Sequence, residues 1–87
     1  MSNWKIVFSV DAQKDLNSLS KSIRNRIFDK LEWFEDNFDS ITPLFLTGKF
    51  SGFCKLRMGD WRAIYEIIWD RNQIVVHVIG HRSDIYE

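Results

Sequence analysis

The chain has 87 residues, of which 45% are hydrophobic and 28% charged, the composition of an ordinary soluble globular protein. Twelve Lys and Arg residues balance twelve Asp and Glu residues, so the chain lacks the overall basic excess of many nucleic-acid-binding proteins. It has no apolar run long enough to span a membrane and no recognisable signal peptide. We therefore expect one domain, residues 1–87, in the cytoplasm.

The first elements are predicted from two different periodicities. Apolar side chains alternate with others from Trp4 to Val10, which indicates a strand with one buried face. Asp11 is a plausible N-cap for a short helix from about Ala12 to Leu19.

A second helix is expected from about Lys21 to Asn37, with Ser18 or Ser20 at its start. Its apolar residues recur every three to four positions and form one stripe that we expect to cover the sheet: Ile23, Ile27, Leu31, Phe34 and Phe38.

Some apolar residues lie outside that stripe. Phe28 and Trp33 fall on its opposite flanks, where each is either a boundary residue of the core, which we favour, or part of a partner-binding surface. The run 44–46 is expected to anchor the loop that follows the helix.

The stretch FCKLRMGDWRAIYE, residues 53–66, predicts a β-hairpin with a two-residue turn at Gly59 and Asp60. That turn places Arg57 opposite Arg62 and Lys55 opposite Ile64. One face of the hairpin is then apolar: Cys54, Leu56, Met58, Trp61, Ala63 and Tyr65.

The other face of the hairpin carries Lys55, Arg57 and Arg62, with Glu66 further along. Because like charges opposed across strands are destabilising, this face indicates a site for an external anion such as RNA. Cys54 is expected to be a buried thiol without reactivity.

The strand after the turn is apolar on both faces near its end, through Trp69, which is typical of a central strand. A further strand, Ile74 to Ile79, should follow a turn at residues 70–73. We therefore predict an α+β fold: an N-terminal strand, a helical hairpin and a three-stranded antiparallel meander, with the helices packed on one face of a four-stranded sheet.

This order of elements, together with KLRMGDWRAIYEI and the closing GHRSDIY, resembles the RelE/ParE superfamily of toxins over nearly the whole chain. The resemblance to RelE-type members implies a metal-independent endoribonuclease, without a cofactor, that cleaves messenger RNA in the ribosomal decoding site. It also implies a cognate RelB-like antitoxin, a toxin–antitoxin heterotetramer, and contact with operator DNA only through the antitoxin.

Carried over residue by residue, the resemblance makes Lys55 the general base and Arg62 a ligand of the scissile phosphate. It makes Arg82 the general acid and Tyr86 a residue that stacks on a nucleotide. RelE-type enzymes often carry another lysine two residues before the position of Lys55, and here that residue is Phe53.

Which residue lies opposite Arg62, and could act as the general acid, depends on the length of the loop before the last strand. A two-residue loop before the last strand pairs His81 with Arg62, and a three-residue loop pairs Arg82 with Arg62. The resemblance favours Arg82, with His81 as the second choice because imidazole titrates near neutrality. We assign Arg57 and His81 to RNA binding.

We expect no metal site, because His77 and His81 on one strand would lie about 13 Å apart. His77 is expected to be a satisfied sheet residue. Two alternatives to the nuclease remain: a ParE-like inhibitor that acts by binding DNA gyrase, and a catalytically inactive module that binds an antitoxin.

Overall fold

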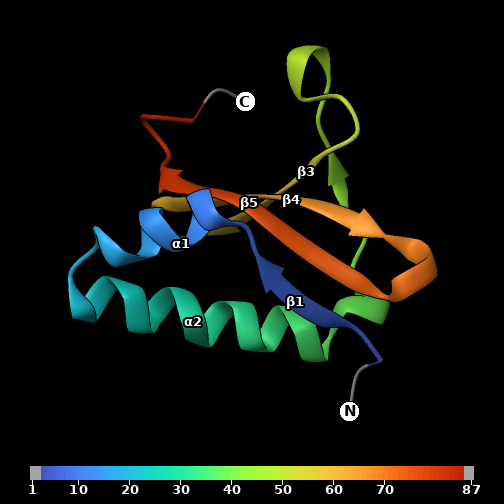
Figure 1. Cartoon of the computed structure of the whole chain (residues 1–87), viewed down its shortest axis with the longest axis horizontal. Helices are drawn as coiled ribbons and strands as arrows, with labels where there is room; N and C mark the ends of the chain where they lie inside the picture. Colours follow the sequence, from blue (N-terminus) through green and yellow to red (C-terminus); the bar gives the residue numbers. More distant parts are fainter. Residues whose placement is uncertain (1–2, 86–87) are drawn as a thin grey trace.

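The computed structural model describes residues 3–85 and has two helices against one face of a five-stranded mixed sheet (Figure 1). The strands are β1 (Lys5–Phe8), β2 (Leu44–Phe45), β3 (Cys54–Met58), β4 (Trp61–Ile68) and β5 (Gln73–His81). Their order across the sheet is β1-β5-β4-β3-β2, in which only β1 and β5 pair in parallel. The predicted α+β class is confirmed, with one strand more than expected.

The helices are α1 (Val10–Asn17) and α2 (Lys21–Asp36), and serines begin both. Ser9 Oγ accepts a hydrogen bond from the N–H of Ala12 at 3.0 Å, and Ser20 Oγ accepts one from Ile23. The predicted cap Asp11 is wrong, because Val10 already lies in the helix, where it is 68% exposed. A cap needs an extended residue before the first helical turn, and Ser9 supplies it.

The predicted stripe of α2 forms the core with the sheet. Ile27, Leu31 and Phe34 are buried, and Phe38 follows them in a 3₁₀ turn, η1 (Phe38–Ser40). The Phe34 ring meets the Tyr65 ring edge-on, with centroids 5.2 Å apart. This packing fixes the helix-covered face of the hairpin as the apolar face predicted from the sequence.

The loop after α2 differs from its prediction. Leu44 and Phe45 pair with β3 as the edge strand β2 and remain 52% and 60% exposed, so they do not anchor the loop in the core. The short helix η2 (Gly48–Phe50) follows. In Figure 1, η2 and the C-terminal segment rise on either side of the sheet face that the helices leave uncovered; we call this the open face.

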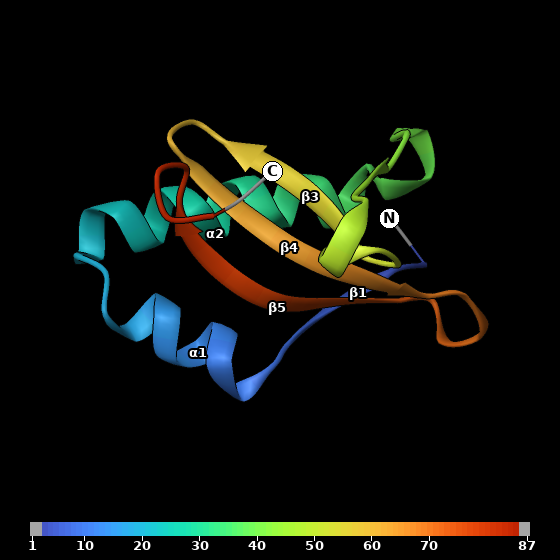
Figure 2. The same ribbon diagram turned by 90° about the horizontal axis from the view of Figure 1, so that it is seen from above.

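The central position of β4 between β3 and β5 is as predicted, and Figure 2 shows these strands side by side. Strand β4 ends one residue earlier than expected, because Trp69 begins a 3₁₀ turn, η3 (Trp69–Arg71), and is 63% exposed. Asn72 completes the connection to β5 with a left-handed backbone, φ 51°.

Two carboxylates protect backbone donors at the β1 side of the sheet. Glu35 Oε2 accepts from the N–H of Ile6 at 2.7 Å, and Asp15 Oδ2 accepts from the N–H of Ile79 at 2.9 Å, beyond the end of the β1–β5 pairing. A side chain that satisfies an edge N–H reduces its availability to another strand. These contacts fasten both helices to the sheet.

Candidate functional site

The turn between β3 and β4 positions the cationic residues. Gly59 has φ +66°, which suits the first position of a two-residue turn that matches the twist of its strands. The observed register pairs Arg57 with Arg62 and Lys55 with Ile64, so the predicted hairpin is confirmed. Arg57 is exposed and Lys55 is half-buried, both on the open face.

Arg62 is held against this turn. Only 8% of its surface is exposed, and its Nη1 donates hydrogen bonds to the carbonyl oxygens of Gly59 at 2.8 Å and Trp61 at 2.9 Å. These bonds tie the guanidinium to the backbone of the hairpin. The arginine therefore stabilises the turn whatever else it binds.

Arg82 reaches the same turn from the end of β5. Its backbone N–H donates to the carbonyl oxygen of Asp60 at 2.8 Å, and its Nε lies 3.7 Å from Asp60 Oδ1. The Arg82 side chain is 63% exposed, so an incoming anion can reach it. The turn thus brings together two arginines that are twenty positions apart in the sequence.

The predicted pairing of Arg62 with His81 or Arg82 is wrong, because Gly80 lies opposite Arg62. His81 instead pairs with Trp61, their rings 5.4 Å apart and edge-on, and so points to the helix-covered face. His81 Nδ1 also lies 2.8 Å from Ser83 Oγ. The connection before β5 has four residues and β5 contains a bulge, and the sequence pattern revealed neither.

Ile85 lies over Gly80. A Cβ atom at Gly80 would lie 3.0 Å from Cδ1 of Ile85, so the glycine makes room for this side chain on the open face. Tyr86, the predicted stacking residue, lies outside the described residues.

An imidazole–carboxylate pair that the sequence did not predict lies on the open face. His77 Nε2 is 3.0 Å from Glu66 Oε1, and the two side chains are 35% and 41% exposed. His77 is the extra residue of the bulge, because Ile64 pairs with Val78 and Tyr65 pairs with Val76. Glu66 pairs with Val75, so His77 is its diagonal neighbour on the same face. The nearest sequence signal was Glu66 on the predicted cationic face.

Cys54 and Tyr65 form a buried polar contact beneath the sheet. Both are at most 1% exposed. Burial raises the pKa of the Cys54 thiol, although the hydrogen bond with Tyr65 acts to lower it. Burial also raises the pKa of the Tyr65 phenol, and the neighbouring Cys54 adds to this effect. The predicted buried thiol is confirmed, and its raised pKa makes it a poor nucleophile.

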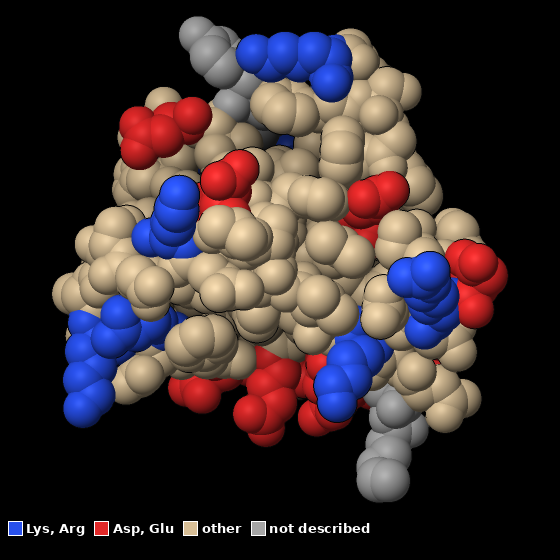
Figure 3. Space-filling view, in the orientation of Figure 1, with Lys and Arg blue, Asp and Glu red and all other residues tan. Residues whose placement is uncertain are grey.

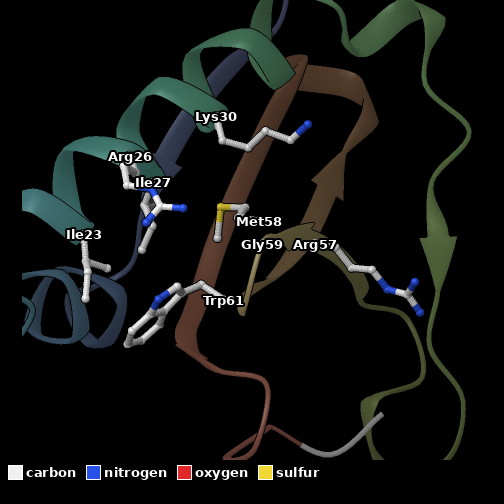
Figure 4. A pocket seen from close by; sticks show the side chains of 8 residues that line it. All are labelled: Ile23, Arg26, Ile27, Lys30, Arg57, Met58, Gly59 and Trp61. Carbon is white, nitrogen blue, oxygen red and sulfur yellow. The ribbon is translucent and has the colours of Figure 1, made fainter.

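A groove of about 300 Å³ lies between α2 and the β3–β4 turn (Figure 4). Arg26 and Lys30, one turn apart on α2, lie along it, whereas the Arg57 side chain points away. The groove is otherwise lined by apolar side chains and a glycine: Ile23, Ile27, Met58, Trp61 and Gly59.

Charge elsewhere is distributed without one dominant patch on the side drawn in Figure 3. Lys and Arg side chains lie there at separate places, with Asp and Glu side chains among them. Within residues 3–85, no three His, Cys, Asp or Glu side chains are placed to hold a metal ion. No helix in the same range is long and apolar enough to cross a membrane.

The fold is shared with solved toxin structures. The Mycobacterium tuberculosis toxin–antitoxin complex RelBE2 contains a chain that matches with a TM-score of 0.80 at 20% identity, over 91% of this chain and 98% of that one. YafQ in the Escherichia coli DinJ–YafQ complex matches with a TM-score of 0.73 at 16% identity, over 98% and 99%. The isolated E. coli RelE toxin matches with a TM-score of 0.69 at 21% identity, over 90% and 83%.

The fold is therefore the one that RelE-like toxins adopt. In sequence, residues 6–86 match the family described as the ParE toxin of type II toxin–antitoxin system, parDE, and the chain belongs to this family. No curated protein matches the chain in sequence. The protein is thus a toxin component of a type II toxin–antitoxin system with a RelE/YafQ fold.

Proposed function

We propose that this toxin is a metal-independent, ribosome-dependent endoribonuclease that cleaves messenger RNA in the decoding site of cytoplasmic ribosomes. The observation that supports this proposal best is the grouping of Arg57, Arg62 and Arg82 around the β3–β4 turn, with Lys55 on the same face. Opposed arginines repel each other, and a bound phosphodiester would interact favourably with both guanidinium groups.

The reaction needs three groups: a base for the 2′-hydroxyl, cations around the phosphate, and an acid for the departing 5′-oxygen. Arg62, held rigidly by the turn, supplies a preorganised positive charge. Arg82, exposed next to Asp60, is the proposed acid, and Lys55 is the base that the family resemblance assigns. Tyr86 is proposed to stack on a base.

The test uses ribosomes programmed with a defined messenger RNA and maps new 5′ ends after addition of the protein. Cleavage within the decoding site is expected, and it should be lost in a Lys55→Ala, Arg82→Ala double variant. Intact messenger RNA in the presence of folded wild-type protein would refute the nuclease.

A second candidate is a ParE-like protein that inhibits DNA gyrase by binding, and the match to the ParE toxin family favours it. It predicts continued translation and accumulation of DNA cleavage complexes after expression. A catalytically inactive module would show neither effect. Assays of both processes after induction separate these three functions.

We further propose that a cognate RelB-like antitoxin binds the groove between α2 and the hairpin, within a toxin–antitoxin heterotetramer that contacts operator DNA through the antitoxin. RelBE2 and DinJ–YafQ are themselves toxin–antitoxin complexes. Arg26 and Lys30 beside an apolar floor fit an amphipathic segment with acidic flanks.

Charge reversal tests this docking site. Arg26→Glu should weaken antitoxin binding, mostly through slower association, because the new exposed carboxylate repels the acidic flank. Lys21→Glu is the matched control. It also reverses a positive charge, at an exposed position of α2 that does not line the groove. Equal affinity of both variants and wild type would exclude the groove.

A further inference from the structure

The pair formed by His77 and Glu66 lies beside the residues assigned to RNA cleavage but has no role in the assignment above. Glu66 shares the open face of β4 with Arg62, since alternate residues of a strand point the same way. His77 follows Val76, which is 1% exposed in the core, so the alternation of β5 turns His77 to this face as well.

The imidazole of His77 is fixed from several directions. Glu66 Oε1 lies 3.0 Å from Nε2, the Phe53 ring meets the imidazole edge-on at 5.3 Å, and Ser9 Oγ donates to the carbonyl oxygen of His77 at 3.1 Å. The first two contacts hold the ring of His77, and the third holds its backbone. A preorganised side chain is what proton transfer requires.

The contact with Glu66 also decides which ring nitrogen carries the proton. An ionised carboxylate only accepts hydrogen bonds, so Nε2 is the protonated nitrogen of the neutral ring and Nδ1 keeps the lone pair. Within residues 3–85, Nδ1 of His77 has no hydrogen-bond partner. His77 and Glu66 are therefore arranged like a catalytic base and the carboxylate that orients it.

The register places this base near the cations. Lys55 pairs with Ile64, and Ile64 pairs with Val78 next to the bulge, so Lys55 and His77 lie on opposite sides of one β4 residue. Two strand spacings separate their backbones by about 10 Å, which leaves room for a ribose phosphate between the side chains.

The charged groups facing His77 come from two strands. Glu66 contacts it from β4, and Lys55 lies beyond β4 on β3. From the β1 side, the neighbours are the uncharged residues Val7, which pairs with Val75, and Ser9. One carboxylate in contact and cations at a distance suit a base that acts on a phosphodiester.

We propose that His77 is the catalytic base of the RNA cleavage reaction and that Glu66 is its positioning residue, an inference that rests on the proposed nuclease function. The 2′-hydroxyl gives its proton to Nδ1 of His77, and the 2′-oxygen forms a bond to phosphorus. The bond to the 5′-oxygen breaks, and this oxygen takes a proton from Arg82, which water reprotonates. In this assignment His77 takes the place of Lys55, which the family resemblance makes the base, and Lys55 instead stabilises charge on the phosphate.

Single-turnover cleavage on programmed ribosomes from about pH 5 to 9 tests the assignment, because imidazole titrates within this range. His77→Ala should slow cleavage about 10²- to 10⁴-fold and abolish the rise of the rate with pH. Added imidazole should restore part of the rate. Lys55→Ala should slow the reaction but retain the pH-dependent rise.

Two further variants separate chemistry from folding. His77→Phe keeps an aromatic ring against Phe53 but has no basic nitrogen. Its free energy of unfolding should therefore match that of the wild type, and its cleavage rate should match that of His77→Ala. Glu66→Gln keeps the size of the side chain, and it should slow cleavage less than His77→Ala and displace the pH-dependent rise without abolishing it.

The outcomes are distinct. Wild-type cleavage with unchanged rates and pH profiles in His77→Ala and His77→Phe would overturn the role of His77 and leave the nuclease in place. Absence of wild-type cleavage would overturn both proposals. Loss of activity in His77→Ala without rescue by imidazole, together with full activity in His77→Phe, would show a structural role only and would also overturn the inference.

Discussion

The backbone N–H of Arg82 donates a 2.8 Å hydrogen bond to the carbonyl oxygen of Asp60, which joins the end of β5 to the turn between β3 and β4. Arg62 is bound to the same turn through the carbonyl oxygen of Gly59. The cationic site is therefore a property of this junction, and changes at the junction should alter binding and stability together.

Arg82→Ala should slow cleavage of a normal RNA about 10²- to 10⁴-fold, because the departing 5′-oxygen loses its acid. The same variant should cleave a substrate with sulfur at that position at nearly the wild-type rate, because a thiolate leaves without a proton. Single-turnover assays with the two substrates provide the comparison. A defect that persists with the sulfur substrate would exclude Arg82 as the acid.

Arg57→Ala should weaken binding to single-stranded RNA without reducing stability, because the exposed Arg57 faces Arg62 and like charges opposed across strands repel. The slope of log affinity against log salt concentration should decrease in magnitude by about 1, the amount expected for the loss of one phosphate contact. Lys21→Ala, an exposed change on α2, is the control. An unchanged slope for Arg57→Ala would remove Arg57 from the RNA site.

Gly80→Ala should lower the free energy of unfolding by no more than about 1 kcal/mol, because a Cβ atom there lies 3.0 Å from Cδ1 of Ile85, the end of a flexible side chain that can shift. Ile85→Ala removes the colliding atoms, so the double variant should be more stable than the sum of the single effects predicts. Urea denaturation of the four proteins measures this coupling. Strict additivity would show that Ile85 does not pack on Gly80 in solution.

Tyr65 should make the protein less stable at high pH. Burial raises the pKa of its phenol in the folded state, so above a pH of about 10 the unfolded chain loses a proton that the folded chain retains. The free energy of unfolding should then fall with increasing pH. Tyr65→Phe should flatten this dependence, and urea denaturation across the alkaline range measures it; equal slopes would contradict the assignment.

Phe28 and Trp33 test where the antitoxin binds on α2. They are 42% and 49% exposed, with Phe28 edge-on to Phe8 at 6.1 Å and Trp33 beneath the ammonium group of Lys30. If the antitoxin occupies the groove beside Arg26, a double change of Phe28 and Trp33 to Ala should leave its affinity within about threefold, less than 1 kcal/mol. Titration calorimetry checks this, and a larger loss would extend the interface to these aromatics.

The sequence by itself determined the elements whose geometry is local. The turn at Gly59 and Asp60 sets the pairing of its strands, and the spacing of Ile27, Leu31 and Phe34 defines the buried face of α2. These patterns depend on neighbouring residues only. The cationic face with Lys55, Arg57 and Arg62 follows directly from them.

Only the tertiary structure decided how distant strands meet. The bulge at His77 shifts the register of β5, so Gly80 and not His81 or Arg82 lies opposite Arg62. Such a shift depends on packing against β4 and on contacts from Ser9 and Glu66, which come from other parts of the chain. A one-residue change of register moves every side chain of a strand to the opposite face. The apolar sequence of β5 is compatible with either register, so the sequence alone cannot place His77 beside the cationic site.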